Sequence, residues 1–179
     1  MSGREVAWRM LAHEYSQSVE EERATEERAA SYVLSPLGAR VNRVLLVGTL
    51  GPSEAIGRDA EAPFYRSRLD DPTGSITVTA GSFQPRAMEA IRTVSAPTEA
   101  MVVGKAHVFR GRDGTAYPSV RAESVRPVSA EEYRALLAEA VAQTLRRLAL
   151  TREIAGGSTD EALRAAGFPT GWIRSARAA

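Results

Sequence analysis

The chain has 179 residues, of which 44% are hydrophobic and 25% charged, as in an ordinary globular protein large enough to bury a core. Its 23 basic and 22 acidic residues give a net charge of +1, which excludes a global basic field that would attract polyanions. Because the chain has no cysteine, disulfides and thiolate metal sites are excluded. No apolar run approaches the roughly 18 residues that span a membrane, so we expect a cytoplasmic protein without membrane contact.

The N-terminal part, residues 1–30, is expected to be a helix followed by a tether. Apolar residues four positions apart, such as Val6 and Met10, predict a short amphipathic helix over residues 3–16. Residues 18–30 are strongly charged with an acidic excess, which indicates an exposed tether that does not bind nucleic acid.

The middle of the chain, residues 31–128, is expected to be a five-stranded barrel. Strand patterns occur at residues 40–50, twice within 64–83, at 101–109 and at 115–125, with a loop at 51–63 and a short helix at 85–94. Five strands with a helix between the third and the fourth is the order of the OB-fold. The predicted fold is therefore mainly β, an OB-fold barrel flanked by an N-terminal and a long C-terminal helix.

The most informative stretch is the predicted hairpin, FYRSRLDDPTGSITVTAGSF. Asp71, Pro72 and Gly74 occupy the first, second and fourth positions of a type I turn. Residues alternate in character on both sides of the turn, which is typical of strands with one buried face. The opposite face and its edge carry two cations, two hydroxyls and an aromatic ring: Arg66, Arg68, Thr77, Thr79 and Phe83.

An arginine-bearing sheet face with aromatic rings nearby is how small barrels hold single-stranded nucleic acid, since guanidinium groups meet phosphates and rings meet bases. A polar outer face exposed to solvent explains the same residues, because every small barrel has one. The turn between the fourth and fifth strands adds Arg110 and Arg112 to the candidates. Phe109 and Tyr117 flank that turn and fit either the binding face or the barrel core.

A long helix is predicted at residues 129–151, followed by a tail of unknown role at 152–179. Ser129 and Glu132 form a capping box at its start. The helix is too long to be covered by one small barrel, so its apolar stripe is expected to bind a partner or a second copy of the chain. The alternative is that it packs on the N-terminal segment. The candidate partner-binding residues are Tyr133, Leu137, Val141, Leu145 and Leu148.

Four stretches resemble the archaeal replication protein A-associated proteins: REVAWRMLAHEY, SYVLSPLGARVNRVLLVGTL, FYRSRLDDPTGSITVTAG and FQPRAM. The resemblance covers about residues 4–148, and the tail matches nothing. It implies an OB-fold and an accessory, nucleoid-associated role in DNA replication, recombination or repair. The implied partners are single-stranded DNA and a replication protein A subunit.

Enzymatic chemistry is not expected. Asp70 and Asp71 are neighbours whose side chains point apart, and the turn already explains Asp71. His13 and His107 lack the spacing of a metal site, and no phosphate-binding glycine loop occurs, so neither metal nor cofactor is expected. The sequence thus favours a non-enzymatic single-stranded DNA-binding protein. The second hypothesis is an adaptor whose barrel is a scaffold and which reaches DNA through its partner.

Overall fold

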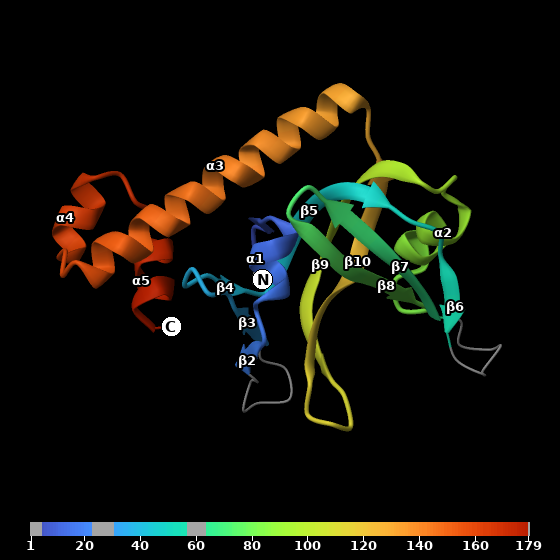
Figure 1. The fold of residues 1–179 in the computed structure, drawn as a ribbon, viewed down its shortest axis with the longest axis horizontal. Coiled ribbons are helices and arrows are strands. Elements are labelled where there is room, and N and C mark those ends of the chain that lie inside the picture. Colours follow the sequence, from blue (N-terminus) through green and yellow to red (C-terminus); the bar gives the residue numbers. More distant parts are fainter. Residues whose placement is uncertain (1–4, 23–30, 57–63, 179) are drawn as a thin grey trace.

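Five strands pair in a closed ring in the structure, a computed structural model that describes residues 5–22, 31–56 and 64–178 (Figure 1). The strands are β5 (Arg43–Leu50), β7 (Phe64–Asp71), β8 (Gly74–Gly81), β9 (Thr98–Arg110) and β10 (Ala116–Pro127). The order around the ring is β5–β9–β10–β8–β7–β5, with β8 and β10 parallel and the other pairs antiparallel. Two short strands, β1 (Trp8–Arg9) and β6 (Glu54–Ile56), extend it to a seven-stranded sheet.

The predicted hairpin is confirmed as β7 and β8. One carboxylate oxygen of Asp71, Oδ1, accepts hydrogen bonds from the backbone N–H groups of Thr73 (2.7 Å) and Gly74 (3.1 Å). The turn chemistry read from the sequence therefore fixes the register, in which Leu69 lies opposite Ile76.

The core lies inside the ring. Residues that alternate along the five strands are fully buried there, among them Val44, Leu46, Leu69, Val78 and Val120. Each such side chain contributes roughly 1.5–3 kcal/mol relative to an exposed one. Closure of the ring also depends on a glycine, because a Cβ on Gly48 would lie 2.5 Å from the carbonyl oxygen of Asp70.

Helices pack against the ring at two places. The helix α2 (Pro85–Thr93), predicted from the sequence, buries Ala87 and Ile91 against the strands. A one-turn helix, α1 (Ala12–Ser16), brings in Tyr15, whose hydroxyl donates to the carbonyl oxygen of Ser119 (2.8 Å) and accepts from the N–H of His107 (3.2 Å). Burial raises the pKa of that hydroxyl.

The prediction of a continuous helix over residues 3–16 is wrong for the part that the structure describes. Trp8 and Arg9 instead form β1, which pairs in parallel with Val44 and Leu45 of β5. Pairing with a distant strand outweighs the local helical pattern, and the Trp8 indole N–H donates to the carbonyl oxygen of Arg40.

The predicted tether and the predicted first strand also change. Residues 20–22 form β2 (Glu20–Glu22) of a second sheet, which also contains β3 (Tyr32–Leu34) and β4 (Arg40–Val41). The strand predicted at 40–50 is divided at Asn42 into β4 and β5. The remainder of the tether, residues 23–30, lies outside the described residues.

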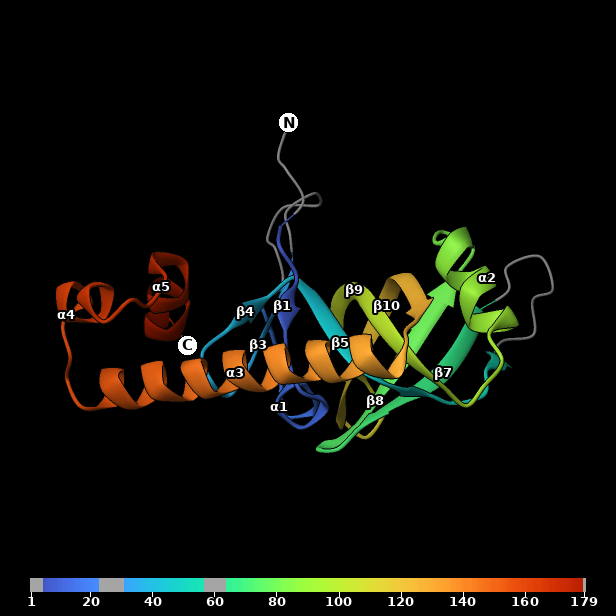
Figure 2. The same ribbon diagram turned by 90° about the horizontal axis from the view of Figure 1, so that it is seen from above.

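The long helix is confirmed as α3 (Ala130–Ala155), with the predicted capping box between Ser129 and Glu132. It runs from the ring to the opposite end of the molecule, where the tail folds into α4 (Asp160–Ala165) and α5 (Thr170–Ala178) (Figure 2). Both helices lie in the stretch for which the sequence predicted only a tail of unknown role. No helix in the described ranges is long and apolar enough to cross a membrane.

Candidate nucleic-acid interface

The register of the ring places the candidate residues of β7 and β8 in two rows on its outer surface. Arg66 lies opposite Thr79, and Arg68 opposite Thr77. Both rows continue across the neighbouring strands. The first reaches Arg121 of β10 and Lys105 of β9, and the second reaches Ser119 and His107. We call these eight residues the outer rows. They are Arg66, Arg68, Thr77, Thr79, Lys105, His107, Ser119 and Arg121.

Exposed aromatic rings border the outer rows. Phe109 and Tyr117 lie opposite each other on β9 and β10, with ring centroids 6.4 Å apart, and are 59% and 51% exposed. The structure thus excludes the barrel-core alternative for both rings. Phe64 precedes Arg66 on the outer side and is exposed, whereas Tyr65 packs against the core, as the alternation predicts.

The two strand arginines are exposed but already paired with carboxylates. Arg66 Nη2 lies 2.8 Å from Oε2 of Glu54, and Arg68 Nε lies 2.6 Å from Oδ1 of Asp70. Partial burial raises the pKa of Asp70, but hydrogen bonds from Ser75 and Arg68 and the charge of Arg68 outweigh it, so the net shift is downward. These side chains border an open cavity of about 610 Å³ that also includes Gly51. A phosphate there must compete with the protein's own carboxylates.

The hydroxyl residues of β8 differ in accessibility. Thr77 is half-buried, but Thr79 is buried and donates from Oγ1 to the carbonyl oxygen of Val120 at 3.3 Å. The expectation that Thr79 is exposed to a ligand is therefore wrong. Thr79 lies between Arg66 and Arg121 in its row, and the much longer side chains of these two neighbours cover it.

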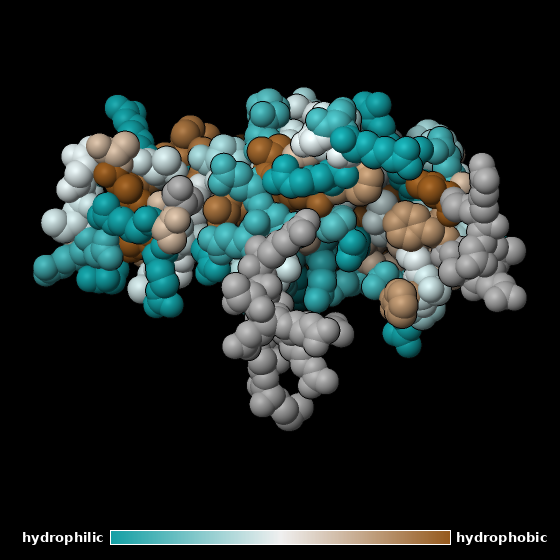
Figure 3. Space-filling model, turned by 90° about the horizontal axis from the view of Figure 1, so that it is seen from below, coloured by the Kyte–Doolittle hydropathy of each residue, from teal (hydrophilic) through white to brown (hydrophobic). Residues whose placement is uncertain are grey.

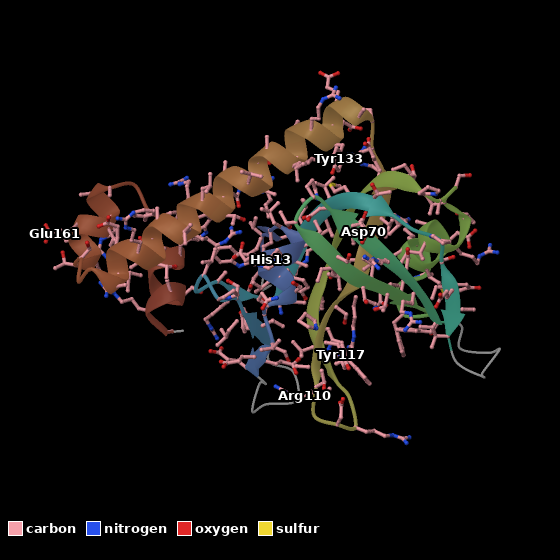
Figure 4. The ribbon with its side chains drawn as sticks, viewed as in Figure 1. His13, Asp70, Arg110, Tyr117, Tyr133 and Glu161 are labelled. Atoms are coloured by element: carbon pink, nitrogen blue, oxygen red, sulfur yellow. The ribbon has the colours of Figure 1, made fainter. Side chains whose placement is uncertain are left out.

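The β9–β10 hairpin carries the predicted turn arginines at its end, and Figure 4 shows Arg110 and Tyr117 there, well away from Tyr133 at the start of α3. Arg110 reaches the carbonyl oxygen of Val19 at 3.4 Å. Arg112 is exposed, and we find no ion pair for it among the described residues. The turn itself is stabilised by Asp113, which accepts from the N–H and hydroxyl of Thr115. Those two hydrogen bonds lower the pKa of Asp113.

The sequence reasoning missed Lys105 and Arg121 as candidate site residues. The signal was present, since Lys105, His107 and Phe109 alternate along one strand and Tyr117, Ser119 and Arg121 along the next. That alternation identifies site residues only when the parallel pairing of β8 with β10 is known, because this pairing places β10 and β9 beside β8 and β7. Figure 3 shows one face of the molecule, on which hydrophilic side chains predominate over the ring with separate apolar side chains among them.

No family model and no curated protein matches the chain. Among solved structures, it is similar to a replication protein A heterotrimer bound to single-stranded DNA, with 17% identity and a TM-score of 0.52. That match covers 80% of this chain and 98% of the other. Together with the ring order, it establishes the architecture. The chain adopts the OB-fold.

Two further matches are weaker. The second single-stranded DNA-binding protein of Mycobacterium smegmatis is 19% identical with a TM-score of 0.41, over 49% of this chain and 86% of that one. The structure of yeast Stn1 and Ten1 gives 10% identity and a TM-score of 0.46, over 61% of this chain and 55% of the other. In the present chain, the N-terminal segment precedes the ring and the helices α3–α5 follow it.

Proposed function

We propose that this protein binds single-stranded DNA on the outer rows, without catalysing a reaction. The observation that carries the proposal is the arrangement of cations and exposed rings on one continuous surface. Arg66, Arg68 and Arg121 would contact phosphates, while Phe109 and Tyr117 at the hairpin would stack on bases. Such contacts do not read base edges, so binding would tolerate any sequence.

The similarity in fold to a replication protein A heterotrimer bound to single-stranded DNA supports this choice of ligand. The ring spans residues 43–127, which are 85 of 179 residues, so a match over 80% of the chain includes elements outside it. The sequence resemblance to replication protein A-associated proteins also supports single-stranded DNA as the ligand. We therefore infer an accessory role beside a replication protein A-type subunit in replication, recombination or repair.

The helix α3 supplies the surface for that partner. Its inner face packs on the rest of the molecule through Ala140, Arg147 and Leu150, which are buried. The opposite face is exposed and carries apolar or small residues at a spacing of three and four, which is the pattern of helices that pair with other helices. We call these residues the α3 stripe. They are Ala135, Ala138, Val141, Ala142, Leu145, Leu148 and Ala149.

Three of the five residues predicted to bind a partner belong to this stripe. Val141, Leu145 and Leu148 are 39%, 59% and 52% exposed, whereas Tyr133 and Leu137 are partly buried. The two predicted roles of the helix are compatible, because one face packs on the N-terminal segment and the other remains exposed. The proposed occupant is a helix of the DNA-binding subunit, and self-association is the competing outcome.

The second candidate function is an adaptor that does not touch DNA itself. The observation in its favour is the pairing of Arg66 with Glu54 and of Arg68 with Asp70, which neutralises the two strand cations. In that case the α3 stripe would be the functional surface, and the OB-fold would serve as a scaffold.

Fluorescence anisotropy of the full chain with labelled oligo-dT across a salt series separates the two functions. Direct binding predicts an affinity for single strands that falls with salt, with a slope of about 0.7 per phosphate contact, and much weaker binding of duplex. No binding at low salt would favour the adaptor, and a preference for duplex would exclude the outer rows as a single-strand site.

A further inference from the structure

A second open cavity, of about 560 Å³, lies where the start of α2 meets β9 and β10. It is lined by Phe83 and Gln84 of the segment between β8 and α2, and by Pro85 and Arg86 at the start of α2. Its strand residues are Lys105, Arg121 and Glu123. Two of these, Lys105 and Arg121, also belong to the outer rows, so the cavity is continuous with the proposed DNA-binding surface.

The cavity carries an excess of available positive charge. Arg86 and Lys105 are exposed, and neither makes an ion pair or side-chain hydrogen bond with any residue that the structure describes. Arg121 contacts a ring nitrogen and not a carboxylate, since its Nη2 lies 3.0 Å from Nε2 of His107. The single carboxylate in the lining, Glu123, is held by Arg43 at 2.5 Å, so its charge is already balanced.

This arrangement contrasts with that of the strand arginines. Arg66 and Arg68 must give up Glu54 and Asp70 before they neutralise a phosphate, whereas Arg86 and Lys105 have no competing anion. Because phosphate binding gains its free energy largely from released counterions, an unpaired cation contributes more than a paired one.

An aromatic ring stands beside these cations. Phe83 is 93% exposed, the largest exposed fraction among the large hydrophobic side chains that the structure describes. A base has a π-face that stacks on such a ring whatever its identity. Cations and an exposed ring that line one cavity match the two parts of a nucleotide, the phosphate and the base.

The position of the cavity agrees with a path along the rows. Arg121 is two strands away from Arg66 in the same row, which puts their backbones about 10 Å apart at the usual strand spacing. One strand of DNA can therefore contact both places within the 4–16 nucleotides that an OB-fold typically covers.

We propose that this cavity is a nucleotide subsite of the DNA-binding surface, in which Arg86, Lys105 and Arg121 bind phosphate and Phe83 stacks on a base. The proposal rests on the proposed function and adds that the main phosphate contacts lie here, at the unpaired cations, instead of at Arg66 and Arg68.

The test compares oligo-dT binding by the wild-type chain, the double variant Arg86→Ala/Lys105→Ala and the control Arg164→Ala/Arg174→Ala. The control removes two exposed cations from α4 and α5, far from the ring in the chain. We expect the first variant to lower the salt slope by about 1.4 and to weaken binding at least tenfold near 0.1 M salt, while the control does neither. Unchanged thermal unfolding checks that both variants stay folded.

Phe83→Ala tests the stacking contact separately. It should weaken binding by about 5- to 150-fold with an unchanged salt slope, because a ring contributes no counterion release. If both cavity variants bind like the control while the wild type binds well, the subsite is overturned and the proposed function stands. If the wild-type chain does not bind oligo-dT at low salt, both proposals fail.

Discussion

Arg147 of α3 and Glu14 of α1 form a buried ion pair, with their side chains 1% and 4% exposed. Two hydrogen bonds join them, from Nη2 to Oε2 at 2.5 Å and from Nε to Oε1 at 2.9 Å. Glu14 also accepts from the hydroxyls of Thr144 and Ser35, so its oxygens are well satisfied. This pair fixes which face of α3 turns inward and therefore which face is left for a partner.

Removal of one member of the pair should destabilise the protein strongly. Glu14→Gln leaves the Arg147 guanidinium buried without a counter-charge, which should lower the free energy of unfolding by about 3–5 kcal/mol. Urea unfolding measures the change. The matched control is Glu139→Gln, which breaks the pair between the half-buried Arg9 and the exposed Glu139 and should cost under about 1 kcal/mol. Equal losses in the two variants would show that burial of the Glu14 pair has no special role.

The tail is attached through two tryptophans. Trp172 of α5 stacks on Trp8 with ring centroids 5.2 Å apart, and the Arg147 guanidinium lies 5.8 Å from the Trp8 ring and 5.7 Å from the Trp172 ring. The Nη1 atom of Arg147 is buried and has no hydrogen-bond acceptor among the described residues. Its charge is instead stabilised by the π-faces of the two tryptophan rings.

Trp172→Ala should therefore detach the tail and leave the ring folded. The lost burial is on the order of 3–5 kcal/mol, comparable to what holds so small a unit in place. Hydrogen exchange should speed up in α4 and α5 and stay unchanged in β7–β10, whereas the exposed control Arg174→Ala should change neither. Faster exchange throughout the ring would mean that the tail is part of the main core.

Arg66→Ala/Arg68→Ala should weaken single-strand binding modestly, and the fold should survive because both side chains point outward. The salt slope should fall by at most about 1.4, and by less if the carboxylate partners limit their contacts. Anisotropy with oligo-dT measures both quantities. If both the affinity and the salt slope stay unchanged, the phosphate contacts do not lie on β7.

Asp70→Asn should act in the opposite direction, because it releases Arg68 from its carboxylate. We expect binding of oligo-dT to become about two- to fivefold tighter at pH 7, in proportion to an exposed ion pair. The pKa of Asp70 is lowered from 3.8, so the carboxylate stays ionised above that value. The wild type and the variant should differ most at neutral pH and converge as pH falls through the lowered pKa. Weaker binding by Asp70→Asn would show that the ion pair positions Arg68 for DNA.

The fold could be predicted from the sequence to the extent that it is locally encoded. The alternation around Arg66 and Arg68 and the turn at Asp71 involve neighbours in the chain, and both were confirmed. The strand at Trp8 was missed because its partner, β5, lies more than thirty residues away. Thr79 was placed on the correct side of the sheet, but its burial depends on the longer side chains that flank it in the row.

The reading of α3 shows the same limit. The spacing of its apolar residues predicts one stripe, yet the structure divides them between two opposite faces. Which face is buried depends on Glu14, a distant residue that draws Arg147 inward. No local pattern contains that information.

Charged residues in the α3 stripe should therefore be tolerated by the isolated chain. Val141→Glu/Leu145→Glu should leave the melting temperature nearly unchanged and abolish association through the helix, whether with a DNA-binding subunit or a second copy. Sedimentation and co-purification measure the association. Leu150→Glu, on the buried face, is the matched control and should unfold the tail. Melting of the stripe variant in the absence of a partner would place the stripe in the monomer's own core.

The most direct test of the central claim is an amide NMR titration of the labelled full chain with oligo-dT of about eight nucleotides. Binding on the outer rows predicts shifts that gather on β7, β8, β9 and β10 and at the segment before α2, with α3–α5 unaffected. Shifts confined to α3–α5, or none at all under low-salt conditions, would contradict it.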